Sequence, residues 1–241
     1  MRRLAGWLPL TASIAALAAE VSIDEWDVPT ENSRPHDPAV APDGALWFTE
    51  QRANKLGRLD PRTGQMKEFP LPTPGSGPHG LVADREGNIW FTAISKGYVG
   101  KLDPKTGSVK EYPTRDRRAR DPHTPVFDQR GRLWFTLEQS NFIGRLDPRN
   151  SEMRLAEVPT QDAVPYGIAV TPDGTVWYSE SGLEPNTLVR FDPRTKKFSS
   201  TPIPSGGGVV RNMVATSDGR VYLAESGVNK VAIAHVSIAA R

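Results

Sequence analysis

The chain has no cysteine and almost no net charge, and each of these absences excludes classes of protein. Without cysteine there can be no disulfide bond and no thiolate metal site, so a metal ion would have to bind histidine, carboxylate or carbonyl groups. The 30 basic and 28 acidic residues leave a formal charge of +2, which is too small to indicate a polyanionic partner. We therefore expect no binding to nucleic acid.

Sustained helical periodicity is also missing beyond residue 19. In its place the sequence has 21 glycines and 22 prolines among 241 residues, a composition that predicts many turns. The 37% of hydrophobic and 24% of charged residues are typical of a folded globular protein. This length is sufficient for one large all-β domain or two small ones.

The N-terminus has the pattern of a secretory signal peptide. Two arginines precede the apolar stretch Leu4–Leu17, and small residues follow up to Ala19. A membrane anchor is the alternative, but the stretch is shorter than the roughly 20 apolar residues that span a bilayer. We predict a signal peptide over residues 1–19 and a single mature domain over residues 20–241, which is periplasmic or secreted and free of the membrane.

The rest of the chain repeats one phrase about every 43 to 45 residues. Each copy has an apolar run, a turn that contains glycine, and an aromatic residue that begins the next strand. The aromatic residues are Trp47, Trp90, Trp134, Trp177 and Tyr222. The turn glycines keep the same step and are Gly44, Gly87, Gly131, Gly174 and Gly219. Because two independent landmarks share one period, the repeat is a strong signal.

Four short strands are predicted within each repeat. In the second copy they cover residues 80–83, 88–92, 98–102 and 108–112, and the β-branched and aromatic residues there favour strands. A four-stranded repeat of this length has the size of a β-propeller blade. The Trp-Phe pairs of the second strands are expected to fill the space between blades. We predict an all-β protein, a β-propeller of five four-stranded blades.

The two ends of the chain predict closure of the ring. The last repeat, residues 211–236, has three strands only. Near the N-terminus, residues 21–29 resemble the fourth strand of the other repeats, such as residues 65–70. We expect this N-terminal strand to complete the last blade and to cover both sheet edges.

Histidine and carboxylate residues fall where the loops of successive blades meet. His36, His79 and His123 lie where the chain enters the first strand of the first three blades, and Tyr166 lies at the same position of the fourth. Since strands run up and down, this entrance lies on the same face as the end of the second strand, where Glu138 follows Trp134. Ligand sites of propellers form at such a mouth.

The third repeat also carries Asp121, two residues before His123. A histidine with two carboxylates is able to hold a divalent cation and to leave a second histidine free as a base. Alternatively, each histidine forms hydrogen bonds to the backbone of a neighbouring blade. We interpret Glu50, Glu180 and Glu225, at positions equivalent to Glu138, as residues that cap loops or pair with arginine.

Several phrases of the repeat resemble the streptogramin B lyases, also called virginiamycin B lyases. They include Leu46–Glu50, Asn54–Leu59 and Pro78–Gly80, and the likeness spans nearly the whole mature chain. That family is a propeller that linearises cyclic depsipeptide antibiotics with a magnesium ion, by elimination of an ester C–O bond without the addition of water. The resemblance therefore implies a lyase that acts on a small cyclic ester and confers antibiotic resistance.

The resemblance also implies roles for individual residues. His79, Asp121 and Glu138 would hold Mg²⁺, although Mn²⁺ suits such ligands equally. His123 would be the catalytic base, because neutral imidazole accepts protons near pH 7. Tyr166 resembles an aromatic residue of the family's substrate site, and we expect His36, at the same position of the first blade, to bind substrate as well.

The chain departs from the family in two respects. Asp121 replaces a glutamate, which shortens the side chain by one methylene group, and five blades are predicted where the family has seven. Two alternatives stay open: a non-catalytic periplasmic propeller that binds a partner or ligand, and a metal-dependent lactonase of the gluconolactonase type. A lactonase of this type would bind its metal through asparagine-rich sites at the axis, whereas the blade entrances of this chain carry histidine. We expect a monomer.

Overall fold

The computed structural model describes residues 22–235, and within this range it contains 19 β-strands and no helix. No helix that could cross a membrane is therefore found in this part of the chain. The predicted signal peptide, residues 1–19, lies outside the described residues.

The strands form five antiparallel sheets in sequence order. The first sheet comprises β1 (Pro35–Val40), β2 (Leu46–Glu50), β3 (Lys55–Leu59) and β4 (Met66–Pro70). The second comprises β5 (Pro78–Ala83), β6 (Ile89–Ala93), β7 (Tyr98–Leu102) and β8 (Val109–Pro113). The third comprises β9 (Pro122–Phe127), β10 (Leu133–Leu137), β11 (Phe142–Asp147) and β12 (Glu152–Glu157). The fourth comprises β13 (Pro165–Val170), β14 (Val176–Glu180), β15 (Thr187–Asp192) and β16 (Lys197–Pro202), and the fifth comprises β17 (Val210–Ala215), β18 (Val221–Glu225) and β19 (Lys230–Ala234).

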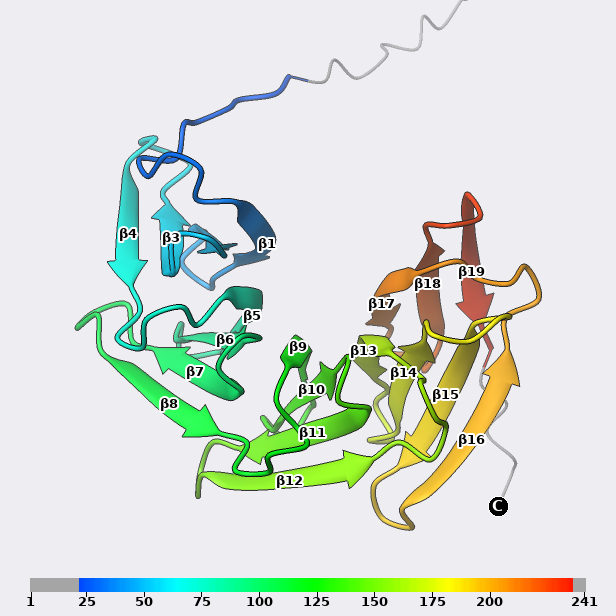
Figure 1. Ribbon diagram of the computed structural model, residues 1–241. Coiled ribbons are helices and arrows are strands. Elements are labelled where there is room, and N and C mark those ends of the chain that lie inside the picture. Colours follow the sequence, from blue (N-terminus) through cyan, green and yellow to red (C-terminus); the bar gives the residue numbers. More distant parts are fainter. Residues whose placement is uncertain (1–21, 236–241) are drawn as a thin grey trace, which may run out of the picture.

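Each sheet is one blade, and the blades follow one another around a common axis (Figure 1). The first strands of successive blades, β1, β5, β9, β13 and β17, are innermost and contact their neighbours in that order. The strands of the second repeat lie where the sequence predicts them. The prediction of an all-β propeller with five blades is confirmed.

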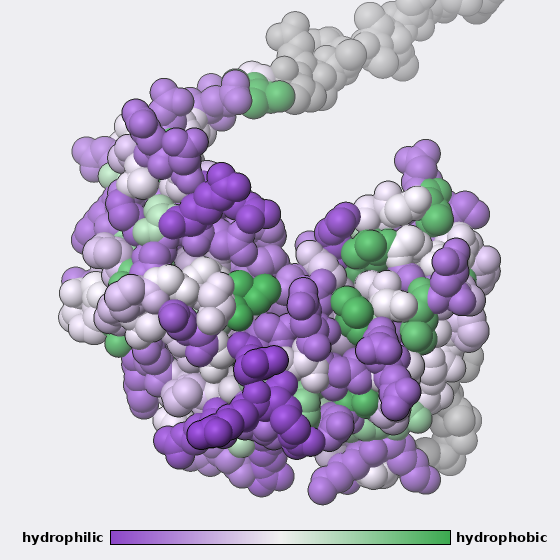
Figure 2. All heavy atoms as spheres, viewed as in Figure 1, coloured by the Kyte–Doolittle hydropathy of each residue, from purple (hydrophilic) through white to green (hydrophobic). Residues whose placement is uncertain are grey.

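The closing strand is the part of the prediction that the structure corrects. Residues 22–34 form no strand, and the last blade has only β17, β18 and β19. The N-terminal segment instead follows the first blade, where the Trp26 ring lies against Gly64 in the turn after β3. An open notch separates the first and last blades (Figure 2), and the segment before β1 does not pair with β19 across it.

Aromatic residues of the second strands fill the space between blades, as predicted. Trp47, Trp90, Phe91 and Phe135 are buried almost completely. The Phe rings lie over glycines of the third strands, and a Cβ atom added at Gly100 would lie 2.1 Å from the Phe91 ring. Only glycine leaves room for the ring there, since protein interiors are close-packed.

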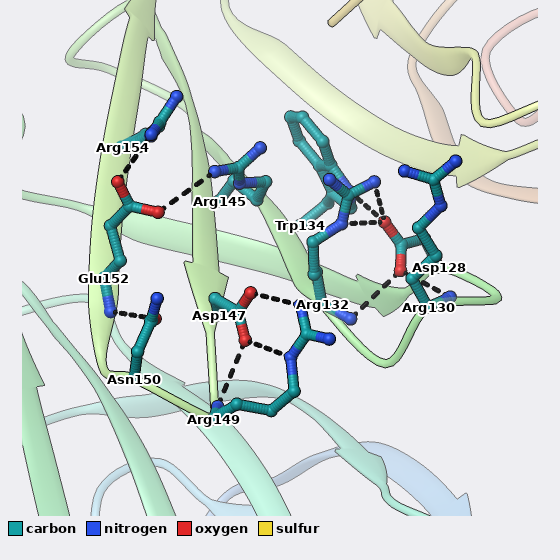
Figure 3. Close-up of polar contacts among 10 residues, drawn as sticks. All are labelled: Asp128, Arg130, Arg132, Trp134, Arg145, Asp147, Arg149, Asn150, Glu152 and Arg154. Carbon is teal, nitrogen blue, oxygen red and sulfur yellow. Dashed lines mark hydrogen bonds and ion pairs between the residues drawn. The ribbon is translucent and has the colours of Figure 1, made fainter.

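The turns between first and second strands are fastened to these aromatic residues. In the third blade the Asp128 carboxylate accepts hydrogen bonds from the backbone of Arg130 and Arg132 and from Trp134 Nε1, the last at 3.0 Å (Figure 3). Burial alone would raise the pKa of Asp128, but these hydrogen bonds outweigh burial and lower it. The carboxylate thereby fixes the Trp134 indole in the core.

Candidate functional site at the mouth of the propeller

A β-bulge at the start of each first strand presents a side chain to the mouth. In the second blade Pro78 pairs with Ala93 and Leu81 pairs with Phe91, so two residues, His79 and Gly80, lie opposite one. The register shifts at the same position in the other four blades. Bulges re-aim side chains next to functional sites, and here each bulge contains the residue that the repeat places at the entrance.

The bulge residues of four successive blades form a row of rings. The ring centroids of His36 and His79 are 4.1 Å apart, and those of His79 and His123 are 3.8 Å apart. Tyr166 meets His123 edge-on at 4.4 Å. This row contains four of the six residues that the sequence predicts for the site.

Threonine hydroxyls hold the backbone of this row of residues in place. Thr92 Oγ1 accepts a hydrogen bond from Gly80 N at 3.0 Å and donates one to the carbonyl of His123, in the next blade, at 2.5 Å. Thr49 and Thr136 donate in the same way to the carbonyls of His79 and Tyr166. Each hydroxyl thus ties a bulge to the neighbouring blade, and it is the backbone carbonyl of the entrance residue, not its ring, that accepts these hydrogen bonds.

His79 and His123 are both neutral at physiological pH. Burial, with His123 nearby, lowers the pKa of His79 to about 3, and burial lowers the pKa of His123 to about 4. His79 is 6% exposed, and its Nδ1 has no hydrogen-bond partner. His123 Nδ1 lies 3.0 Å from Thr124 Oγ1.

Glu138 is the carboxylate that reaches His123. Its Oε2 lies 3.4 Å from His123 Nε2, and 19% of its side chain is exposed. Burial and the neighbouring charge of Asp121 raise the pKa of Glu138, whereas Arg211 lowers it. A histidine beside a carboxylate is the arrangement that orients an imidazole for general-base chemistry.

Glu138 has no counterpart in the other blades, which corrects the expected equivalence. Glu50 and Glu180 lie opposite the first residue of their blades, where the third blade has Leu137. Glu138 is one residue further along, and because side chains alternate along a strand it leaves on the other side. Glu180 and Glu225 accept hydrogen bonds from Thr187 and Ser205, as expected for residues that hold loops.

Asp121 is occupied by hydrogen bonds to the turn next to Glu138. Its carboxylate accepts hydrogen bonds from the backbone of Gln139 and the hydroxyl of Ser140, and so holds the turn that follows β10. Among residues 22–235, the only group of three potential ligands whose atoms lie within 4.8 Å of one another is His36, Asp37 and His79. His79, Asp121 and Glu138 therefore do not fit a metal ion as a set in this conformation.

The sequence predicts no role for two further residues at the mouth, Arg211 and Asp37. Arg211 occupies the bulge position of the fifth blade, donates to Ser226 Oγ at 3.0 Å, and lies close enough to Tyr166 and Glu138 to lower the pKa of both. Asp37 contacts His36 Nδ1 at 2.7 Å. Their positions in the repeat could have identified both residues: Arg211 is itself an entrance residue, and Asp37 directly follows one.

Comparison with known proteins decides the family. The family model described as "Virginiamycin B lyase family" matches residues 7–191 and 126–239. The chain belongs to the virginiamycin B lyase family. A search of curated protein sequences finds no match.

Solved structures of this family share the fold of the chain. Virginiamycin B lyase from Staphylococcus aureus is 26% identical, with a TM-score of 0.77 over 90% of this chain and 75% of that chain. A streptogramin B lyase is 30% identical, with a TM-score of 0.77 over 90% of this chain and 73% of that chain. A gluconolactonase from Xanthomonas campestris, 16% identical with a TM-score of 0.62 over 83% of this chain and 71% of that chain, shares the fold alone.

Proposed function

We propose that this member of the virginiamycin B lyase family opens a cyclic ester by elimination of a C–O bond, with His123 as the base. The observation that carries the proposal is the buried, neutral His123 imidazole, held between His79 and Tyr166 with Glu138 at 3.4 Å. Relatives with solved structures are named virginiamycin B and streptogramin B lyases, which supports a cyclic depsipeptide as substrate.

The base has a definite task in such an elimination. His123 takes the proton from the carbon beside a carbonyl group, the electron pair of that C–H bond forms a C=C double bond, and the C–O bond on the next carbon breaks. The ester carboxylate leaves, and no water is consumed. Because burial lowers the pKa of His123 to about 4, the imidazole retains its lone pair at neutral pH.

The neighbours of His123 stabilise charge on either side of the reaction. Glu138 orients the imidazole and favours its cationic form once the proton has been taken. The Tyr166 ring contacts His123, and Arg211 lies close to Tyr166. The Tyr166 hydroxyl and the Arg211 guanidinium are both able to donate a hydrogen bond to the developing enolate or carboxylate oxygen. Since His79, Asp121 and Glu138 do not converge, no step of this mechanism passes through a metal ion that they share.

Turnover by matched histidine variants tests the proposal. The purified protein, His123→Ala and His235→Ala are incubated with a streptogramin B, and ring opening is followed by chromatography. We expect wild type and His235→Ala to open the ring and His123→Ala to lose at least about a hundredfold in rate, the usual contribution of a general base. Equal rates for His123→Ala and wild type would remove His123 from the mechanism. Expression of an active protein in a sensitive bacterium should also confer resistance.

A non-catalytic binding role is the second candidate, and the position of Asp121 favours it. The carboxylate that the family resemblance assigns to the metal instead holds the turn after β10. A binding protein would retain its affinity for a cyclic depsipeptide in His123→Ala and would leave the ring intact in every variant. Calorimetry with the intact macrocycle distinguishes this outcome from catalysis.

A further inference from the structure

We propose that His36, Asp37 and His79 bind a divalent transition-metal ion between the first and second blades. This site is displaced by one blade from the set that the family resemblance implies. It is independent of the proposed lyase activity, since a metal ion can bind there whether or not the ring of an ester is opened.

The three side chains converge because two equivalent bulges lie next to each other. His36 and Asp37 lie in the bulge of β1, and His79 lies in the bulge of β5. One potential ligand atom from each residue lies within 4.8 Å of the other two. The centroids of the two imidazoles are 4.1 Å apart.

One hydroxyl group holds both strands of this site in place. Thr49 Oγ1 accepts a hydrogen bond from the backbone N–H of Asp37 at 3.2 Å and donates one to the carbonyl of His79 at 2.8 Å. Thr49 is fully buried. The ligands are therefore carried by a preorganised backbone rather than by a loop, as precise metal sites require.

An unsatisfied nitrogen marks the inner end of the site. His79 is 6% exposed, and its Nδ1 has no hydrogen-bond partner. Buried polar atoms are nearly always partnered, and the unpartnered Nδ1 of His79 is a nitrogen that is free to bind an ion. At the outer end, Asp37 contacts His36 Nδ1 at 2.7 Å, so the carboxylate and the imidazole of the two other potential ligands already lie side by side.

The donor set selects the class of metal. Two imidazoles and one carboxylate are typical ligands of zinc, iron and other transition metals, whereas magnesium prefers a shell of oxygen atoms. Zinc binds such ligands at about 2.0–2.2 Å, so ligand atoms that lie up to 4.8 Å apart must move towards one another when the ion binds. Three protein ligands leave a position open for water or substrate, beside His123.

Metal titration of the chelator-treated, untagged protein tests the site. We expect one Zn²⁺ to bind per chain by calorimetry and Mg²⁺ to fail to compete. His36→Ala and Asp37→Asn should each weaken Zn²⁺ binding by at least about tenfold, while His235→Ala, the matched control, should leave it unchanged. Glu138→Gln and Asp121→Asn, which remove the alternative ligands, should also leave it within about twofold.

Nuclear magnetic resonance of the imidazole nitrogens provides a second measurement that needs no variant. The chain has only four histidines, and Zn²⁺ should shift the nitrogens of His36 and His79 directly while those of His235 stay unmoved. The proposal is overturned if wild type binds no Zn²⁺, if His36→Ala binds as tightly as wild type, or if Glu138→Gln loses binding as His36→Ala does. All of these measurements are made without substrate, so an inactive protein that binds Zn²⁺ at His36 would leave this site intact and refute only the lyase.

Discussion

Replacement of Thr92 by valine tests whether the hydroxyls behind the mouth hold the row of rings in register. Valine has nearly the same shape as threonine, so the packing of this fully buried side chain is preserved. What is lost is the acceptor for Gly80 N, at 3.0 Å, and the donor to the carbonyl of His123, at 2.5 Å. Both backbone groups are then left buried without a partner.

The expected cost follows from those two groups. An unsatisfied buried donor or acceptor costs about 1 to 3 kcal/mol, so the loss of both partners in Thr92→Val should lower the free energy of unfolding by about 2 to 6 kcal/mol. Urea unfolding followed by tryptophan fluorescence measures this difference. Thr92→Ser keeps the hydroxyl and should recover most of the loss, because only a methyl group is removed.

Thr92→Val should also slow the lyase reaction, since the carbonyl that it releases belongs to His123. The rate should fall while Thr92→Ser stays near wild type. If Thr92→Val and Thr92→Ser are equally stable and equally active, the hydroxyl does not position His123 and the reasoning is refuted.

The other predictions concern packing, acid stability and the arginine of the mouth. Gly100→Ala places a methyl group 2.1 Å from the Phe91 ring and should destabilise the fold by about 1 to 3 kcal/mol or more, seen as a lower melting temperature; an unchanged melting temperature would contradict the packing described. His123 has a folded-state pKa of about 4, against about 6.5 in the unfolded chain. Between these two pH values the unfolded chain binds a proton that the folded chain does not. The free energy of unfolding therefore falls as the pH drops from 6.5 towards 4, by on the order of 3 kcal/mol in all. Chemical unfolding at pH 7 and pH 5 measures this loss in wild type, and His123→Ala should lose less. Arg211→Gln should raise the pKa of Glu138, whose charge Arg211 favours; carboxyl titration by nuclear magnetic resonance would show no shift if the two groups do not interact.

Most of the fold could be predicted from the repeat. Its period sets the number of blades, and glycine and proline mark the turns, because these residues are needed there for local reasons. The position of His79 and His123 within the repeat also predicts that they meet, since equivalent residues of neighbouring blades face the same axis. These features depend on short-range geometry that every copy shares.

The errors arise where the copies differ. The segment before β1 has the alternation of a fourth strand, but alternation does not specify which sheet edge is within reach. Glu138 is shifted by one residue from Glu50 and Glu180, which changes the side from which its carboxylate leaves the strand. Asp121 binds the turn after β10, a contact between loops that no spacing within the repeat reveals.

The most direct test of the proposed function is the mass of the product formed in ¹⁸O-labelled water from a streptogramin B. Elimination with His123 as the base predicts a linear product with the same mass as the macrocycle and no ¹⁸O, which forms with wild type and His235→Ala but not with His123→Ala. A product that carries one labelled water, or a macrocycle that stays closed with wild type, would contradict the account.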